Sequence, residues 1–284
     1  MAAGSDRMAL RAEQARAELR LIAAGRHGRD RLRVARILLH AHARLGRGSA
    51  VLGWLGGGED PPRRVEMRCG LRMLVRRADA VPLYEQFGLD VYGLRLPGPP
   101  PSTIVDVGAN VGYAAIRFAR RYPAARLVCV EPEPTSRELL RANLELNGIA
   151  ASVFDVAVVG EAGAYRIVAA PVPSGVAVAH AEHSTADDED DGVTGVTLGA
   201  LLDRAGVDQA DLVKLDIEGS EWSVFADAPQ WAARVGALVC ELHGGGVAEA
   251  DRLLGPHGFT RLERPAGLRF RDVVCYVRGA AHRI

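Results

Sequence analysis

Lysine is almost absent from this 284-residue sequence: of 35 basic residues only Lys214 is a lysine, and the other 34 are arginines. The four cysteines show no Cys-x-x-Cys spacing, so no paired-cysteine motif is present. No run of eighteen apolar residues occurs, which excludes an ordinary membrane-spanning helix, and the N-terminus lacks the apolar core of a signal peptide. We therefore expect a reduced, cytoplasmic protein without a membrane span.

The net charge is zero, but basic residues are concentrated at one end. Residues 1–77 contain 17 arginines and 7 acidic residues, a surplus of ten. Such an arm can bind nucleic acid or an anionic surface, whereas the simpler interpretation is a solvated helical face. Because Trp54 is the only aromatic residue available there for stacking on bases, we favour the solvated face and expect no nucleic-acid partner.

The first part of the chain is predicted to be a helical extension. Residues 8–24 and 30–46 have helical periodicity, and the second helix carries an apolar stripe suited to a partner helix or to a neighbouring subunit in a homodimer. The stripe consists of Leu32, Ala35, Leu38, Leu39, His42 and Leu45. A glycine- and proline-rich linker over 53–62 closes the extension. We predict one domain over 1–62 and a second over 63–284, opening with a hairpin over 63–77 and a helix over 83–92.

From residue 103 onward, predicted strands and helices alternate. This is the pattern of an α/β fold with a doubly wound, mostly parallel seven-stranded sheet. An insertion over about 160–197 interrupts it with a hairpin, 165–170 and 176–179, and with five consecutive acids over 187–191 that must form an exposed loop. The strands are predicted near 103–107, 126–130, 152–158, 211–216, 236–241, 257–263 and 272–278. The helices are predicted near 112–121, 134–147, 198–205, 220–226 and 247–255.

A glycine-bearing turn links the first of these strands to the first helix. Because glycine has no Cβ, a ligand can approach the backbone of this turn closely. Glu131, at the end of the next strand, can accept hydrogen bonds from a ribose diol. The turn lacks the Gly-x-Gly-x-x-Gly order of a dinucleotide site and has Asp106 at the strand end. A carboxylate there favours a methionine ammonium over a pyrophosphate. The turn resembles the S-adenosylmethionine (SAM) motif of class I methyltransferases, and we expect Asp106, Gly108, Asn110 and Gly112 to hold the methionine end.

Ionisable residues gather where two later strands end. Lys214 and Asp216 share one face of their strand, Glu218 follows, and His243 ends the next strand. His243 or Lys214 could act as the general base, with Asp216 and Glu218 orienting a substrate hydroxyl. In a metal-dependent variant, Asp216, Glu241 and His243 could coordinate Mg²⁺ or a similar divalent ion.

Further residues have less specific assignments. Asp155, late in the third strand, could accept from an adenine amino group, although Ala157 or a backbone amide could take that place. Glu221 suits the start of a helix, where a carboxylate complements the helix dipole. His183 and Ser184, just before the acidic run, could cover a substrate.

Taken together, several segments resemble the FkbM family of SAM-dependent methyltransferases. The resemblance covers roughly residues 80–280, and LVKLDIEGSE is its most specific part. It implies a class I methyltransferase fold and methyl transfer to a hydroxyl of a small molecule, such as a polyketide, sugar or other secondary metabolite. The segments are IVDVGANVGY, CVEPEP, FDVAVVG, LVKLDIEGSE and VCELH.

Two interpretations from other classes stay open: a non-catalytic SAM-binding scaffold and a nicotinamide-dependent oxidoreductase. Methylation of nucleic-acid amino groups is disfavoured, because the expected Asp/Asn-Pro-Pro-aromatic loop is replaced by residues 216–219, Asp-Ile-Glu-Gly. Cytosine C5 methylation is disfavoured because the sequence has no Pro-Cys dipeptide.

Overall fold

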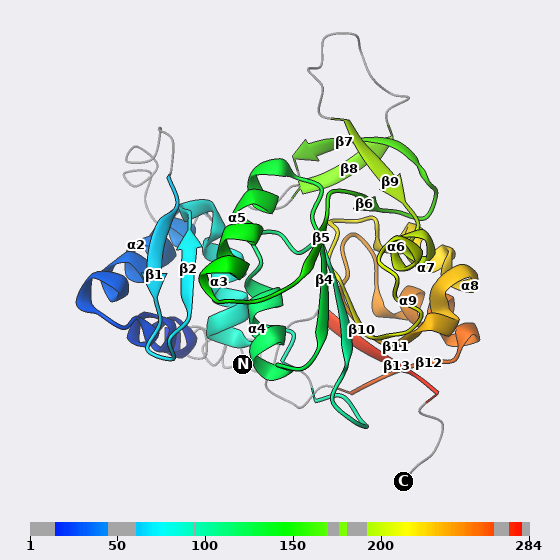
Figure 1. Cartoon of the computed structure of the whole chain (residues 1–284), viewed down its shortest axis with the longest axis horizontal. Helices are drawn as coiled ribbons and strands as arrows, with labels where there is room; N and C mark the ends of the chain where they lie inside the picture. The colour runs from blue at the N-terminus through cyan, green and yellow to red at the C-terminus, as the bar shows by residue number, and fades with distance from the viewer. Residues whose placement is uncertain are drawn as a thin grey trace, which may run out of the picture. The chain divides into compact units, whose positions relative to one another are not determined.

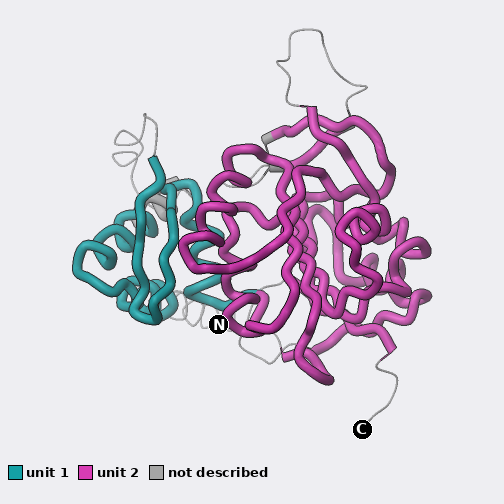
Figure 2. The backbone as a smooth tube through the Cα atoms, viewed as in Figure 1, with its two compact units in different colours: residues 1–91 teal, residues 92–284 magenta. Residues whose placement is uncertain are grey.

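A computed structural model describes residues 15–44, 61–93, 95–169, 176–180, 192–263 and 273–279. The chain forms two compact units, residues 1–91 and 92–284 (Figure 2). The division falls later than the boundary predicted after residue 62. The predicted hairpin therefore belongs to the first unit rather than to the start of the second.

The first unit combines helices with a small hairpin. Residues 15–24 are helical, and α2 spans Gly28–Arg44. The strands β1 (Arg63–Glu66) and β2 (Arg72–Val75) pair antiparallel, as predicted. The last helix begins as α3 (Ala80–Leu83) and continues as a π-helical segment, Tyr84–Leu89.

The buried side of α2 differs from the predicted stripe. Val34, Ile37 and Leu38 are buried, whereas Leu32, the first residue of that stripe, is 51% exposed. A helix repeats every 3.6 residues, so Val34, Ile37 and Leu38 form a contiguous face that does not include Leu32.

The second unit is built on a seven-stranded sheet with the order β12-β13-β11-β10-β3-β4-β5. Every neighbouring pair is parallel except those involving β13, which runs antiparallel to β11 and β12. The predicted doubly wound α/β sheet is thus confirmed. Its strands are β3 (Thr103–Val107), β4 (Arg126–Val130), β5 (Ser152–Phe154), β10 (Ala210–Leu215), β11 (Val235–Glu241), β12 (Phe259–Arg261) and β13 (Val273–Arg278).

Helices cover both faces of this sheet (Figure 1). On one side lie α4 (Tyr113–Arg121) and α5 (Pro134–Leu146). On the other lie α6 (Leu198–Arg204), α7 (Glu221–Ala226), α8 (Ala228–Trp231) and α9 (Val247–Leu254). The main apolar core lies on this second side, where Val105 and Val213 of the sheet pack with Leu201, Phe225 and Trp231. Strand alternation directs the intervening residues, including Asp106 and Lys214, to the opposite face.

A separate four-stranded sheet has the order β6-β9-β7-β8. Its strands are β6 (Ala157–Val158), β7 (Gly163–Ala169), β8 (Val176–His180) and β9 (Gly192–Val196). The predicted hairpin is confirmed by the β7–β8 pairing. The predicted continuous strand over 152–158 is wrong, because the chain leaves the main sheet after Phe154 and enters the second sheet at Ala157. His183, Ser184 and the acidic run over 187–191 lie outside the described residues.

Three cysteines, Cys129, Cys240 and Cys275, are buried within strands of the main sheet. Buried there, each acts as a small apolar residue. Among the described residues, no helix has the length and apolar character needed to cross a bilayer.

Candidate active site

The turn after β3 brings its backbone against the end of β10. Gly108 has a φ of +74°, and a Cβ built on it would lie 1.8 Å from the carbonyl oxygen of Asp216. The amides of Gly108 and Ala109 both donate to the carbonyl of Val130, which fixes the turn against β4. Gly112 has a different role, since a Cβ there would meet Leu140 of α5 at 2.7 Å. The first glycine shapes a ligand site, and the second allows two helices to pack.

A cavity that opens to solvent lies at the carboxyl ends of β3, β4 and β10. Of the predicted cofactor residues, Gly108, Asn110 and Glu131 line it. Asp106, Gly112 and Asp155 are not among its lining residues, and Asp155 is exposed. The remaining lining residues are Val107, Val130, Pro132, Ser136, Val156, Ala157, Val158, Val178, Asp216, Ile217, Glu218 and Ser220.

Glu131 is held in this cavity by two backbone amides. One carboxylate oxygen accepts from the amide of Asn110 at 2.8 Å, and the other from that of Glu133 at 2.9 Å. Glu131 is only 6% exposed. Burial raises the pKa of Glu131 to about 7, although the two amide bonds oppose the rise. The turn and the second strand end are therefore joined through this carboxylate.

Lys214 and Asp106 form a buried pair between neighbouring strands. They are register partners in β10 and β3, and the Lys214 Nζ lies 3.1 Å from Asp106 Oδ1. The ammonium also donates to the carbonyl of Gly108 at 2.6 Å and lies 3.4 Å from Asp216 Oδ2. Asp106 therefore contacts Lys214 and does not line the cavity.

This environment argues against the predicted base role of Lys214. Burial alone would lower the pKa of its ammonium, but the charges of Asp106 and Asp216 outweigh burial and raise that pKa. Burial raises the pKa of Asp106, and Lys214 partly offsets the rise. A protonated ammonium has no lone pair with which to accept a proton. Lys214 instead fixes the turn through Gly108 and orients Asp216.

His243 is oriented by Glu221 at the start of α7. Because a carboxylate can only accept, the His243 Nδ1–H donates to Glu221 Oε1, at 3.0 Å. Glu221 is fully buried and also accepts from the amides of Ile217 and Gly219, at 2.9 Å each. These amide bonds confirm its predicted place at the helix start, while its contact with His243 was not predicted.

The pKa of His243 is raised to about 9, chiefly by the hydrogen bond to Glu221 and against the effect of burial. His243 is thus an imidazolium at neutral pH. It can act as a general base only after it loses this proton, so proton acceptance by His243 is not its resting condition.

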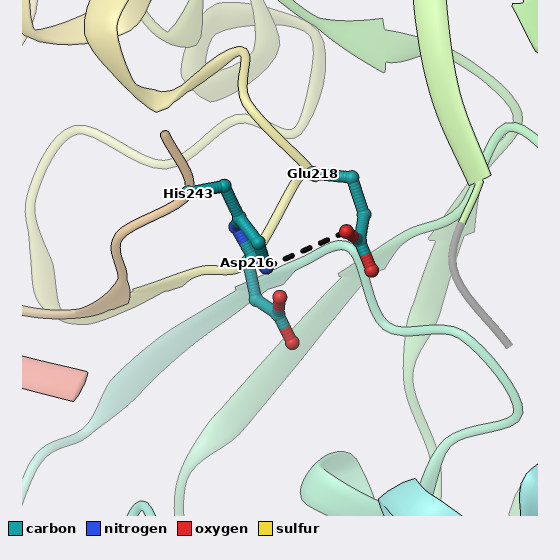
Figure 3. Close-up of side chains that lie close together, drawn as sticks. All are labelled: Asp216, Glu218 and His243. Carbon is teal, nitrogen blue, oxygen red and sulfur yellow. Dashed lines mark ion pairs between the residues drawn. The ribbon is translucent and has the colours of Figure 1, made fainter. Parts of the chain in front are cut away.

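Asp216, Glu218 and His243 lie close together (Figure 3), and the first two line the cavity. One ligand-type atom from each lies within 4.8 Å of the other two. His243 Nε2 is 3.4 Å from Glu218 Oε2 and 3.9 Å from Glu241 Oε1. Glu218 reaches this position with a left-handed backbone, φ +52°, which is uncommon for a residue with a side chain. Burial raises the pKa of Glu218, and the charge of His243 partly offsets the rise.

Tyr92 completes the site and is not among the residues predicted from the sequence. Its hydroxyl lies 2.9 Å from Asp216 Oδ2 and 3.3 Å from Glu241 Oε2, and its ring centroid is 5.4 Å from the Lys214 Nζ. Burial and the charge of Asp216 raise the pKa of Glu241 to about 7. No local motif marks Tyr92, because its partners lie more than a hundred residues away in sequence. Tyr92 and Lys214 therefore both hold Asp216 through its Oδ2 atom.

The strand order, with β13 as the one antiparallel strand among the described strands of the main sheet, defines the class I methyltransferase fold. Its ligand cavity lies where such sheets bind ligands, at the carboxyl ends of the strands. The family model described as the methyltransferase FkbM domain matches residues 106–260, more than half of the chain. The chain therefore belongs to the FkbM methyltransferase family.

The chain is also similar to individual proteins. The 31-O-demethyl-FK506 methyltransferase FkbM of Streptomyces tacrolimicus is 28% identical over 192 residues, covering 57% of this chain and 74% of the relative. Methyltransferase sdnD of Sordaria araneosa is 28% identical over 193 residues, with the same coverage. The crystal structure of methyltransferase FkbM from Methylobacillus flagellatus KT is 14% identical and has a TM-score of 0.47, covering 72% of this chain and 55% of that one.

Proposed function

We propose that this protein is a SAM-dependent O-methyltransferase whose acceptor is a hydroxyl group of a small molecule, such as a secondary metabolite or a sugar. The family and a relative named as a 31-O-demethyl-FK506 methyltransferase support this proposal. The observation that carries it is one cavity lined both by Glu131, at a ribose-binding position, and by Asp216 and Glu218, at an acceptor position.

The chemistry of the residues on the cofactor side suits SAM. Glu131 would hold the ribose hydroxyls, because each carboxylate oxygen has lone pairs beyond the one used by a backbone amide. Gly108 and Asn110 would border the methionine end, where the absence of a Cβ at Gly108 keeps the backbone close. When bound, SAM supplies a methyl group activated by a positively charged sulfur.

The acceptor side requires a group that orients a hydroxyl and takes its proton. Asp216 is fixed by Tyr92 and Lys214, so its carboxylate is already positioned before a substrate arrives. Glu218 lines the cavity, and its raised pKa makes it a better proton acceptor than an exposed carboxylate. We assign hydroxyl orientation to Asp216 and proton acceptance to Glu218, with His243 placed beside Glu218.

Calorimetric titration with S-adenosylhomocysteine (SAH) tests the cofactor assignment. We expect micromolar binding to the unaltered chain and a loss of at least about tenfold for Glu131→Ala, because two charge-assisted hydrogen bonds disappear. The matched control is Asp155→Ala. Asp155 is an exposed acid between β5 and β6, and its substitution should change the affinity less than about threefold. Thermal unfolding of each variant shows whether it is folded.

Absence of SAH binding to the unaltered chain would reject the proposed function. Equal losses for Glu131→Ala and Asp155→Ala would instead restore Asp155 to the adenine role that its sequence position predicted.

The affinity for SAH should also depend on pH. The ribose-binding form of Glu131 is the carboxylate, and its pKa is about 7. Lowering the pH from 8 to 6 protonates most of it, so affinity should fall about tenfold. Calorimetry at pH 6, 7 and 8 measures the change, and Glu131→Gln should flatten the profile. A profile that persists in Glu131→Gln would assign the titration to another group, such as Glu241.

A further inference from the structure

The convergence of Asp216, Glu218 and His243 combines two carboxylates and an imidazole from the ends of neighbouring strands. We propose that these three residues bind a divalent metal ion of the Mn²⁺ type at the edge of the cavity, and that His243 releases its Nε2 proton when the ion binds. This inference deepens the proposed function, and it rests on that function for one further ligand, the hydroxyl oxygen of the acceptor.

The distances suit a metal centre. Ligand atoms about 2.1 Å from a small divalent ion lie roughly 3–4 Å from one another. The three atoms here lie within 4.8 Å of one another, and His243 Nε2 and Glu218 Oε2 are already 3.4 Å apart. Small side-chain rotations therefore close the site. Two oxygens and one nitrogen match ions that accept both carboxylate and imidazole ligands, such as Mn²⁺, better than Ca²⁺.

An outer partner already orients the imidazole for metal binding. Metal-ligating histidines commonly donate their second ring N–H to a carboxylate, which fixes the tautomer and the ring orientation. Glu221 does this to His243 Nδ1 and is itself fixed by two backbone amides. Nε2 is thereby directed toward Glu218 (Figure 3).

Asp216 is oriented in a similar way. Tyr92 and Lys214 both contact its Oδ2 atom, at 2.9 and 3.4 Å. Both contacts that the structure describes for this carboxylate use Oδ2, so Oδ1 is available for a metal ion. Because Asp216 and Glu218 also line the cavity, the remaining coordination positions open toward a bound substrate.

The charge of the neighbourhood favours a cation. Asp106, Asp216, Glu218, Glu221 and Glu241 supply five carboxyl groups around Lys214 and His243. Lys214 is engaged by Asp106 and Asp216, and His243 by Glu221 and Glu218. A divalent ion would offset the surplus negative charge. It would also bind an acceptor hydroxyl and lower its pKa. Glu218 would bind the ion through one carboxylate oxygen and take the hydroxyl proton on the other.

Glu241 provides a matched control for the proposed ligand Glu218. The sequence predicted Glu241 as a ligand, but its Oε1 is 3.9 Å from His243 Nε2, and its Oε2 lies 3.3 Å from the Tyr92 hydroxyl. Glu218→Gln and Glu241→Gln remove the same charge from the same neighbourhood. They differ only in which carboxylate the proposal makes a ligand.

The experiment is a titration of the chelator-treated full chain with Mn²⁺, followed by the electron paramagnetic resonance signal of free Mn²⁺. Five adjacent acidic residues at 187–191 could also attract Mn²⁺, so every protein in the titration carries the corresponding amide at each of these positions. We expect one Mn²⁺ per chain, at least about tenfold weaker binding in Glu218→Gln and in His243→Gln, and less than about threefold change in Glu241→Gln. The background substitutions are Asp187→Asn, Asp188→Asn, Glu189→Gln, Asp190→Asn and Asp191→Asn.

Absence of Mn²⁺ binding at millimolar concentration would overturn the proposal. Equal weakening by Glu218→Gln and Glu241→Gln would also overturn it, because such a result indicates general electrostatic attraction rather than coordination. SAH titration of the same proteins separates the two proposals. SAH binding without Mn²⁺ binding rejects the metal site and keeps the proposed function, and the opposite result rejects the proposed function and keeps the metal site.

Discussion

Alanine in place of Gly108 is expected to destabilise the second unit by about 3 kcal/mol or more and to abolish SAH binding. Two effects add. The residue has a φ of +74°, and the new Cβ would lie 1.8 Å from the Asp216 carbonyl oxygen. The contact is with backbone, so no side-chain rotation relieves it. The end of β10 must move away from the turn, and Asp216 and Glu218 move with it.

Gly148→Ala is the matched control for this prediction. Gly148 also has a positive φ, +64°, but nothing lies within 4 Å of the position of its Cβ. It should therefore show only the backbone cost, about 1 kcal/mol. Urea unfolding of both variants measures the difference. Similar losses for the two would show that the close approach between the turn and β10 is absent in solution.

Replacing Lys214 with methionine is expected to cost about 3–5 kcal/mol of stability near neutral pH. The substitution keeps much of the apolar volume but leaves the Asp106 carboxylate fully buried without its cation. Asp106→Asn in the same chain removes that charge. The double variant should therefore recover a large part of the loss, and a double-mutant cycle measures the coupling.

The pH dependence gives this prediction a second readout. Burial already raises the pKa of Asp106, and removing Lys214 raises it further. A carboxyl group whose pKa is higher in the folded state stabilises the fold at low pH, and that contribution is lost as the pH rises through the folded pKa. The deficit of Lys214→Met relative to the unaltered chain should therefore be smaller at pH 5 than at pH 8. A constant deficit would indicate lost packing rather than an unpaired charge.

The sequence predicted most of the second unit because local patterns determine it. Alternating apolar strands and amphipathic helices, with a glycine turn after Val107, define a doubly wound sheet and the edge at which it binds ligands. The same reasoning placed Glu131, Asp216, Glu218 and His243 at that edge. Strand ends are specified by sequence, and parallel strands bring their carboxyl ends together.

Other features depend on information that local patterns do not contain. The strand register makes Lys214 the neighbour of Asp106, and this pairing turns a predicted base into a buried structural ammonium. Tyr92 reaches Asp216 from a loop that shows no periodicity. The pairing of His243 with Glu221 depends on how α7 packs beside β11. Each contact joins segments that only the complete fold brings together.

Val178 of β8 lines the cavity, although β8 belongs to the second sheet and makes no strand pairing with the main one. The cavity is thus lined by two parts of the chain whose sequences can change independently. Substitutions in the β7–β8 hairpin can reshape one wall while the strand ends that carry Glu131 and Asp216 stay as they are. Under the proposed function, such substitutions would change which substrates are accepted without changing the residues that carry the chemistry.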